Sequence, residues 1–260
     1  MTRQEDEMGR IGIMAALHDE ISSLLEAMGP DAERTRVGRR DYYTGAIHGR
    51  EVVVVLARVG KVAAAATAVT LIREFDARVV VFAGLAGAVA RDVAVGDVVV
   101  ATALLQHDLD ASPLFPCYEV PLLERSRFDA DRATSERLSL AAREYLAEVL
   151  PRQVPADTLA AFGVADPRVH RGVIISGDRF VGCGAAVRGL RDELPDALCV
   201  EMEGAAVAQI CYEYDVPCAV VRTISDRADD EASASFSGFL SRVARYYSAG
   251  ILERFLTMAW

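Results

Sequence analysis

The chain has 260 residues, of which 52% are hydrophobic, so it can bury a large core in a single domain. Its formal net charge of -10 argues against recognition of nucleic acid, because binding to a phosphate backbone depends on clustered Lys and Arg. We therefore expect a small-molecule partner and no nucleic acid.

The amino-terminal segment MTRQEDEMGR is charged, and no apolar run approaches the roughly 20 residues needed to span a bilayer. The five cysteines contain no CxxC pair, which favours buried free thiols in a reducing compartment. These features predict a cytoplasmic protein without membrane contact, whose residues 1–9 are flexible. No His, Asp or Glu spacing indicates a metal site, and we expect no cofactor.

Short β-branched runs alternate along the chain with longer amphipathic runs. The first strand is expected at 10–17, followed by a helix at 20–28, a hairpin at 42–59 that turns at His48-Gly49, and a helix at 62–75. Further strands are expected at 78–84, 97–104, 169–176, 198–203 and 218–225, and further helices at 134–150, 205–214 and 236–256. The helix at 134–150 is expected to start with a Thr or Ser cap and an acidic first turn.

This alternation predicts one α/β domain over residues 1–260: a three-layer sandwich with a central mixed, mostly parallel, twisted sheet and helices on both faces. The segment 106–128 holds three prolines and no clear period, so we expect a long loop there. A loop of this length inside a compact domain is more often functional than idle.

Ligands of such sheets bind at the carboxyl ends of the strands, and polar groups cluster at those ends here. They are His18, Asp19 and Glu20 after the first strand, Ser176, Gly177 and Asp178 after VHRGVIIS, Glu201 and Glu203 in VEMEGAAVA, and Arg222, Ser225 and Asp226 in CAVVRTISD. A buried carboxylate without a partner is costly, so each acid should be exposed, paired or functional. Taken singly, Glu20 could serve as an acid at a helix N-terminus, and Asp226 could cap a turn.

The segments RIGIMAALHDEISSLL, VGKVAAA, GDVVVATALLQHDLD, VIISGDRFV, VEMEGAAVAQ and VVRTISDRAD resemble, in order and spacing, the nucleoside phosphorylase and nucleosidase superfamily. Within it the chain is most similar to 5′-methylthioadenosine/S-adenosylhomocysteine nucleosidases, over about residues 10–256. The resemblance implies hydrolysis of the bond between adenine and a 5′-thio-substituted ribose, in a homodimer. Such a reaction needs an acid for the leaving base and a second group that activates water.

The resemblance implies the catalytic residues. Asp226 matches the acid that protonates purine N7, and Ser225 beside it supports that acid. Glu20 matches the residue that orients and deprotonates the attacking water, and Arg222 matches a residue near that water.

The resemblance also implies the substrate-binding residues. Glu203 would accept hydrogen bonds from the ribose hydroxyls, Met202 would pack on the sugar, and Glu201 would lie next to the site. Phe180 would stack on adenine and the backbone of Val181 would read its edge. Leu17 and Phe236 would line the 5′ pocket, and Phe115 and Tyr118 in the long loop would reach the 5′ pocket of the neighbouring subunit.

Two positions depart from the family pattern. Phosphorylases hold phosphate with an Arg before a glycine-rich turn and a Ser or Thr within it, but VFAGLAGAV has Phe82 and Leu85 at those places. Leu85 would press on the ribose or water site, whereas Arg58 could still meet an anion. Hydrolysis is therefore the favoured hypothesis, with a phosphate-dependent phosphorylase and a non-catalytic nucleoside-binding relative as the alternatives.

Overall fold

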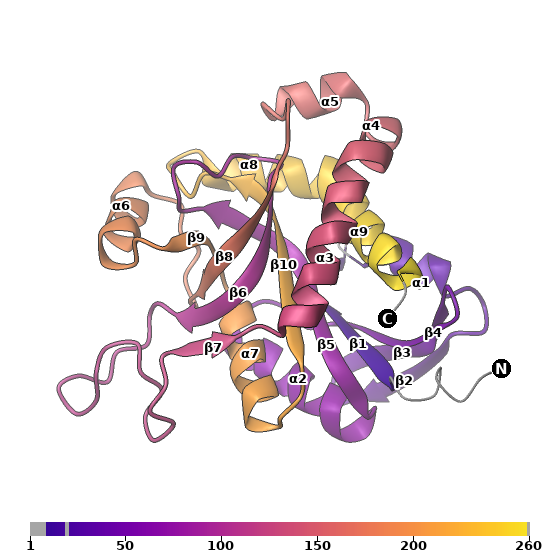
Figure 1. The fold of residues 1–260 in the computed structure, drawn as a ribbon, viewed down its shortest axis with the longest axis horizontal. Coiled ribbons are helices and arrows are strands. Elements are labelled where there is room, and N and C mark those ends of the chain that lie inside the picture. Colours follow the sequence, from indigo (N-terminus) through magenta and orange to yellow (C-terminus); the bar gives the residue numbers. More distant parts are fainter. Residues whose placement is uncertain (1–8, 19–20, 259–260) are drawn as a thin grey trace.

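A mixed sheet of ten strands runs through the computed structural model, which describes residues 9–18 and 21–258 (Figure 1). The strands are β1 (Arg10–Ala15), β2 (Glu33–Val37), β3 (Arg40–Ile47), β4 (Arg50–Leu56), β5 (Ala77–Ala88), β6 (Val98–Gln106), β7 (Arg127–Asp129), β8 (Val169–Ser176), β9 (Ala197–Glu201) and β10 (Cys218–Asp226). The helices are α1 (Ser22–Ala27), α2 (Lys61–Glu74), α3 (Arg132–Glu144), α4 (Leu150–Gln153), α5 (Ala156–Ala161), α6 (Gly184–Glu193), α7 (Gly204–Glu213), α8 (Ala232–Phe239) and α9 (Arg245–Thr257).

The sheet bends back on itself around β5. The strand order is β10-β6-β8-β9-β5-β1-β4-β3-β2, and β10 also pairs directly with β5. Strands β4, β1, β5 and β10 are parallel, whereas β9 meets the end of β5 in the antiparallel sense at Gly87 and Ala88. The carboxyl ends of β1, β5, β8, β9 and β10 are thereby brought around one space.

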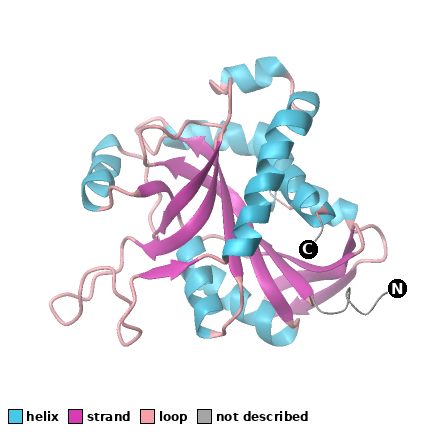
Figure 2. Cartoon of the chain, in the orientation of Figure 1, coloured by secondary structure: helices cyan, strands magenta, loops and turns pink. Residues whose placement is uncertain are grey.

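Helices cover both faces of this sheet, as the sequence predicts (Figure 2). Helices α2 and α7 pack against each other on one face, whereas α3, α9 and α1 lie on the other. Two separate apolar clusters fill the two interfaces: one contains Leu24, Leu138 and Leu252, and the other contains Leu71, Phe82 and Val207. The three-layer α/β architecture is confirmed. In the part of the chain that the structure describes, every helix is too short or too polar to cross a membrane.

The hairpin predicted around His48-Gly49 is confirmed as β3 and β4. Both turn residues have positive φ, 50° for His48 and 77° for Gly49. This is the backbone that a two-residue turn needs to match the twist of its strands. Cys199, Cys211 and Cys218 are buried as expected, but Cys117 and Cys183 are exposed.

The predicted cap of the helix at 134–150 is wrong. Helix α3 begins at Arg132, and the side chain of Asp131 accepts a hydrogen bond of 2.8 Å from the backbone N–H of Thr134. A carboxylate caps a helix as well as a hydroxyl does, and Asp131 stands three residues before the expected start. The helix predicted at 236–256 is interrupted by a π-helical turn at Leu240–Ala244, which separates α8 from α9.

Strands β2 and β7 and helices α4, α5 and α6 were not predicted, and β7 takes in the last two residues of the segment expected to be a loop. Strand β2 reads ERTRV and is largely exposed at the sheet edge, so it lacks the apolar alternation that marks a half-buried strand. Helix α6 fully buries only Val187, with Leu190 partly buried beside the same apolar cluster. These elements depend on tertiary packing more than on local pattern.

Candidate active site

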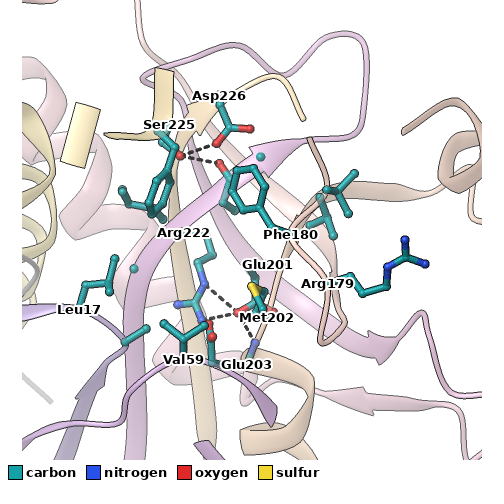
Figure 3. A pocket seen from close by; sticks show the side chains of 18 of the residues that line it. Leu17, Val59, Arg179, Phe180, Glu201, Met202, Glu203, Arg222, Ser225 and Asp226 are labelled. Carbon is teal, nitrogen blue, oxygen red and sulfur yellow. Dashed lines mark hydrogen bonds and ion pairs between the residues drawn. The ribbon is translucent and has the colours of Figure 1, made fainter. Parts of the chain in front are cut away.

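A pocket opens where the carboxyl ends of the parallel strands meet (Figure 3). Ala16 and Leu17 follow β1, β5 contributes Phe82 and Gly84–Gly87, and Arg179–Val181 follow β8. The remaining lining residues are Val59, Val200, Glu201, Met202, Glu203, Arg222, Ser225, Asp226 and Phe236. The ends of several strands thus contribute to one cavity, whereas His18, Ser176, Gly177 and Asp178, also singled out at strand ends, are not among its lining residues.

Most residues singled out from the sequence line this pocket, namely Leu17, Leu85, Phe180, Val181, Glu201, Met202, Glu203, Arg222, Ser225, Asp226 and Phe236. Glu20, the predicted activator of water, lies outside the described residues, as do Asp19 and residues 1–8. Sequence reasoning missed Val59 and Arg179, although each stands beside a segment that it did use, VGKVAAA and SGDRFV.

Glu201 is the centre of a buried hydrogen-bond network. Its carboxylate accepts hydrogen bonds from the backbone N–H of Glu203 at 3.1 Å and of Gly204 at 2.8 Å, and from the hydroxyl of Ser176. Ser176 Oγ in turn accepts the backbone N–H of Ala205 at 2.7 Å. These contacts hold the turn between β9 and α7. Glu201 thus braces the pocket wall that it helps to line, and its contact with substrate, expected from the sequence, stays a prediction.

Arg222 pairs with Glu201 at the floor of the pocket. Its Nη2 and Nε lie 2.6 Å and 3.2 Å from Oε2 of Glu201, and Nη1 donates to the backbone oxygens of Phe82 and Val221, each at 3.1 Å. The Phe82 ring covers one face of the guanidinium, with Cζ 4.1 Å from the ring centroid. A buried Arg needs this set of partners, because an unpaired charge in the core is costly.

Glu203 is held by a different part of the chain. Its side chain is buried, and Oε1 accepts a hydrogen bond of 2.8 Å from the backbone N–H of Gly60, immediately before α2. Glu203 also stands at the start of α7, where helix dipoles favour a negative charge. The two acids of VEMEGAAVA both line the pocket but have different partners: Glu201 is bound to Arg222, Ser176 and the backbone of the β9–α7 turn, whereas Glu203 accepts the N–H of Gly60.

Asp226 is buried at the opposite end of the pocket (Figure 3). Ser225 Oγ lies 2.8 Å from Oδ2 of Asp226, and the backbone N–H of Ala228 donates to Oδ1 at 2.8 Å. Burial raises the pKa of Asp226, with a smaller contribution from the charge of Asp229, and outweighs these two hydrogen bonds, which lower it. A Cβ at Gly87 would stand 2.8 Å from Oδ1, so the carboxyl approaches β5 closely only because residue 87 is glycine.

Phe180 and Phe236 form the aromatic part of the wall. Their ring centroids are 5.9 Å apart and the planes meet at 70°. Phe180 is 50% exposed, so an apolar ring at the pocket mouth has no complete protein cover. Such a surface can stack on a planar ligand.

The 106–128 loop projects from the body of the protein, beyond β7 (Figure 1). The Tyr118 hydroxyl donates to Glu193 of α6 at 2.7 Å, and this hydrogen bond, together with burial, raises the pKa of Tyr118. Neither Phe115 nor Tyr118 lines the pocket of its own chain. Among the residues described, no three His, Cys, Asp or Glu side chains are grouped to hold a metal ion.

The sequence model that defines the phosphorylase superfamily matches residues 10–257, nearly the whole chain. The chain belongs to the phosphorylase superfamily. Its place in the superfamily agrees with the sheet topology and with a pocket at the strand ends.

Members of the superfamily are similar to this chain over most of their length. An aminodeoxyfutalosine nucleosidase of Helicobacter pylori is 35% identical over 239 residues, which cover 91% of this chain and 93% of that protein. A 5′-methylthioadenosine/S-adenosylhomocysteine nucleosidase of Anoxybacillus flavithermus is also 35% identical, covering 92% of this chain and 94% of that one.

Solved structures of superfamily members share the fold. The nucleosidase of Neisseria meningitidis in complex with methylthio-immucillin-A has a TM-score of 0.83 and 32% identity, covering 95% of this chain and 98% of that chain. The Streptococcus pyogenes enzyme with 5-methylthiotubericidin has a TM-score of 0.82 and 32% identity, covering 96% and 97% of the two chains.

Proposed function

We propose that this protein hydrolyses the N-glycosidic bond of an adenine nucleoside, 5′-methylthioadenosine or S-adenosylhomocysteine or both, and releases adenine and a 5′-thio-substituted ribose. The observation that carries the proposal is the placement of two carboxyl groups in unlike surroundings within one pocket. Asp226 is buried with a raised pKa, whereas Glu203 is fixed by a backbone N–H donor. The name of the Anoxybacillus flavithermus relative supports these substrates, and the name of the Helicobacter pylori relative supports a nucleosidase reaction.

Asp226 is suited to protonate the leaving base. Cleavage of the glycosidic bond leaves electrons on the purine, and a proton delivered to N7 neutralises them. A neutral carboxylic acid can donate that proton, and burial favours the neutral form of Asp226. The Ser225 hydroxyl, 2.8 Å from Oδ2, holds the carboxyl in place through the transfer.

Glu203 and Met202 are suited to bind the sugar. An ionised carboxylate only accepts hydrogen bonds, so it can receive both hydroxyls of a ribose diol. The backbone N–H of Gly60 donates a hydrogen bond to Oε1 of Glu203 and so orients the carboxylate, which keeps further acceptor sites for the ribose hydroxyls. Negative charge close to the sugar also stabilises an oxocarbenium-like transition state.

The remaining walls fit the base and the 5′ substituent. Phe180 would stack on adenine, with the Val181 backbone at its edge, and the apolar side chains of Leu17, Val59 and Phe236 would receive the thio substituent. Glu20 remains the proposed activator of water. Support comes from residues close to Glu20 in the sequence: Leu17 lines the pocket, and Ile21 is buried in the core.

Phosphorolysis is not favoured by the lining of the pocket. Phe82 and Leu85 both line it, and both are buried apolar side chains at places where a phosphate would need a cation and a hydroxyl. Phe82 also covers the face of Arg222. Arg58 is turned to the backbone oxygen of Arg39 and is not part of the lining.

We further propose that the protein is a cytoplasmic homodimer in which the long loop, through Phe115 and Tyr118, reaches the 5′ pocket of the partner subunit. The apolar side chain of Leu114 in this loop is 83% exposed in the single chain. Exposed apolar surface often marks a contact with another protein, so this supports a partner subunit that covers the loop. Light scattering coupled to size exclusion tests the dimer, and a monomer at micromolar concentration would contradict it.

A panel assay tests the reaction. Purified protein is incubated with 5′-methylthioadenosine, S-adenosylhomocysteine, adenosine, deoxyadenosine and inosine, with and without phosphate, and the free base is measured. We expect adenine release from the thio-substituted nucleosides in phosphate-free buffer. Turnover that appears only with phosphate, with a sugar phosphate as product, would establish the phosphorylase. Binding without turnover of any nucleoside would establish a non-catalytic relative.

A further inference from the structure

Lys61 is the only lysine in the chain, since every other residue among the 28 Lys and Arg is an arginine. Its side chain is only 15% exposed, and Nζ lies 2.5 Å from Oδ1 of Asp108 and 3.9 Å from Oδ2 of Asp178. An ammonium is a compact point charge, whereas a guanidinium is a planar fork that needs more room. A half-buried ammonium between two carboxylates therefore distinguishes this position from the arginines of the chain.

The Lys61 cluster, made of Lys61, Asp108 and Asp178, joins three segments that are far apart in the sequence. The second oxygen of Asp108 accepts the backbone N–H of Asp178 at 2.8 Å, and Oδ1 of Asp178 accepts the backbone N–H of Lys61 at 2.9 Å. Asp108 lies at the base of the long loop, Asp178 in the turn that leads to Phe180, and Lys61 at the start of α2. Each member contacts the other two.

The same first turn of α2 holds Glu203. Gly60 adopts φ 99° and ψ 154°, a region open almost only to glycine, and this backbone aims its N–H at Oε1 of Glu203, 2.8 Å away. Gly60 has no side chain to cap the helix, so the carboxylates of Glu203 and Asp178 receive the first N–H groups of α2 instead.

We propose that Lys61 and Asp108 are positioning residues for Glu203, an inference that rests on the proposed function. The ion pair fixes the first turn of α2, and that turn directs the Gly60 N–H onto the carboxylate that binds the ribose. Lys61 balances one of the two negative charges of Asp108 and Asp178, which lessens their repulsion of the Glu203 carboxylate at the same helix start. Because Asp108 begins the long loop, a displacement of that loop would reach the sugar site through this cluster.

Selectivity for the ribose hydroxyls tests the proposal. Lys61→Met, Lys61→Arg and Asp108→Asn are compared with the unchanged protein on 5′-methylthioadenosine and on its 2′-deoxy and 3′-deoxy analogues. A misplacement of about 1 Å can cost about 10²-fold in rate, so we expect each variant to lose about tenfold or more in kcat/KM on the ribonucleoside. The loss on the deoxy analogues should be several-fold smaller, because they lack a hydroxyl that Glu203 would bind.

The control variant is Arg254→Met, which breaks ion pairs of 2.8 Å to Glu144 and to Glu148, outside both the pocket lining and the 106–128 loop. It should leave the ratio of ribo to deoxy activity unchanged. Equal losses on ribo and deoxy substrates in the Lys61 and Asp108 variants, or no loss, would overturn the positioning role. If Lys61→Met does not fold, Lys61→Arg keeps the charge and Asp108→Asn keeps the shape, so these two variants decide the outcome.

Failure of the proposed function would look different. In that case the unchanged protein itself would release no adenine from any nucleoside. Calorimetric binding of adenosine and of its deoxy analogues then measures the same selectivity without turnover. Lys61→Arg and Asp108→Asn should still weaken the binding of adenosine more than the binding of its deoxy analogues. An equal loss of affinity for all of them would refute the inference.

Discussion

Arg222 and Glu201 form a buried ion pair, with Nη2 of Arg222 2.6 Å from Oε2 of Glu201 and both side chains almost inaccessible. Glu201 also receives the N–H groups of Glu203 and Gly204. The pair therefore links β10 to the turn that carries Glu203, the proposed ribose-binding acid.

Glu201→Gln should destabilise the fold strongly. The change leaves the Arg222 charge buried without its anion, which typically costs about 3–5 kcal/mol. Urea denaturation measures the free energy of unfolding. Asp196→Asn, which removes the anion from the exposed Arg127 pair, is the matched control and should cost at most about 1 kcal/mol. Equal effects of the two changes would contradict the bracing role of Glu201.

Asp226→Asn should cut turnover by about 10² or more while nucleoside binding stays measurable, because the amide keeps the shape but cannot donate the proton to N7. Single-turnover adenine release and calorimetric affinity separate the two effects. Near-normal turnover would remove Asp226 from the role of acid.

The same variant should change how stability depends on pH. Burial raises the pKa of Asp226 above its ordinary 3.8, so the stability that this carboxyl contributes is present below the unfolded pKa and is lost as pH rises through the folded one. Asn does not ionise. Asp226→Asn should therefore gain stability relative to the unchanged protein as pH rises from about 4 to about 8. A difference in unfolding free energy that is flat with pH would show that the carboxyl stays unperturbed.

Glu203→Gln should weaken sugar binding without unfolding the protein. The amide oxygen can still accept the Gly60 N–H, whereas its NH₂ group replaces one acceptor of the ribose diol. Loss of a hydrogen bond to a charged group costs about 1.5–3 kcal/mol, so kcat/KM should fall by roughly tenfold or more. The melting temperature should stay within a few degrees. Unchanged kinetics would exclude the ribose contact.

Phe180→Ala should raise KM with little effect on stability, because the ring is already 50% exposed. Stacking of a base on an aromatic side chain contributes about 1–3 kcal/mol. Leu140→Ala, at an exposed apolar site on α3 away from the pocket, is the control. If both variants behave alike, Phe180 does not stack on the base.

Hydrophobic periodicity located most of the elements. The β-branched run VHRGVIIS matches β8 at both ends, and the alternation around His48-Gly49 matches the β3–β4 hairpin, because side-chain patterning and turn backbone act over a few residues. The pattern did not reveal β2 or α6. Their exposed faces carry little apolar signal, and their positions depend on neighbours distant in the sequence.

The sequence by itself determined the residue types at the strand ends, and hence a pocket of acids, an arginine and aromatic rings at one edge of the sheet. Only the tertiary structure decided what each acid does. Glu201 and Glu203 are two residues apart and both line the pocket, yet the bend of the chain between β9 and α7 pairs one with Arg222 and the backbone of that turn, and the other with the N–H of Gly60. Tertiary contacts likewise bring Lys61, Asp108 and Asp178 together, because electrostatic partners are chosen by distance in space and not by spacing in the chain.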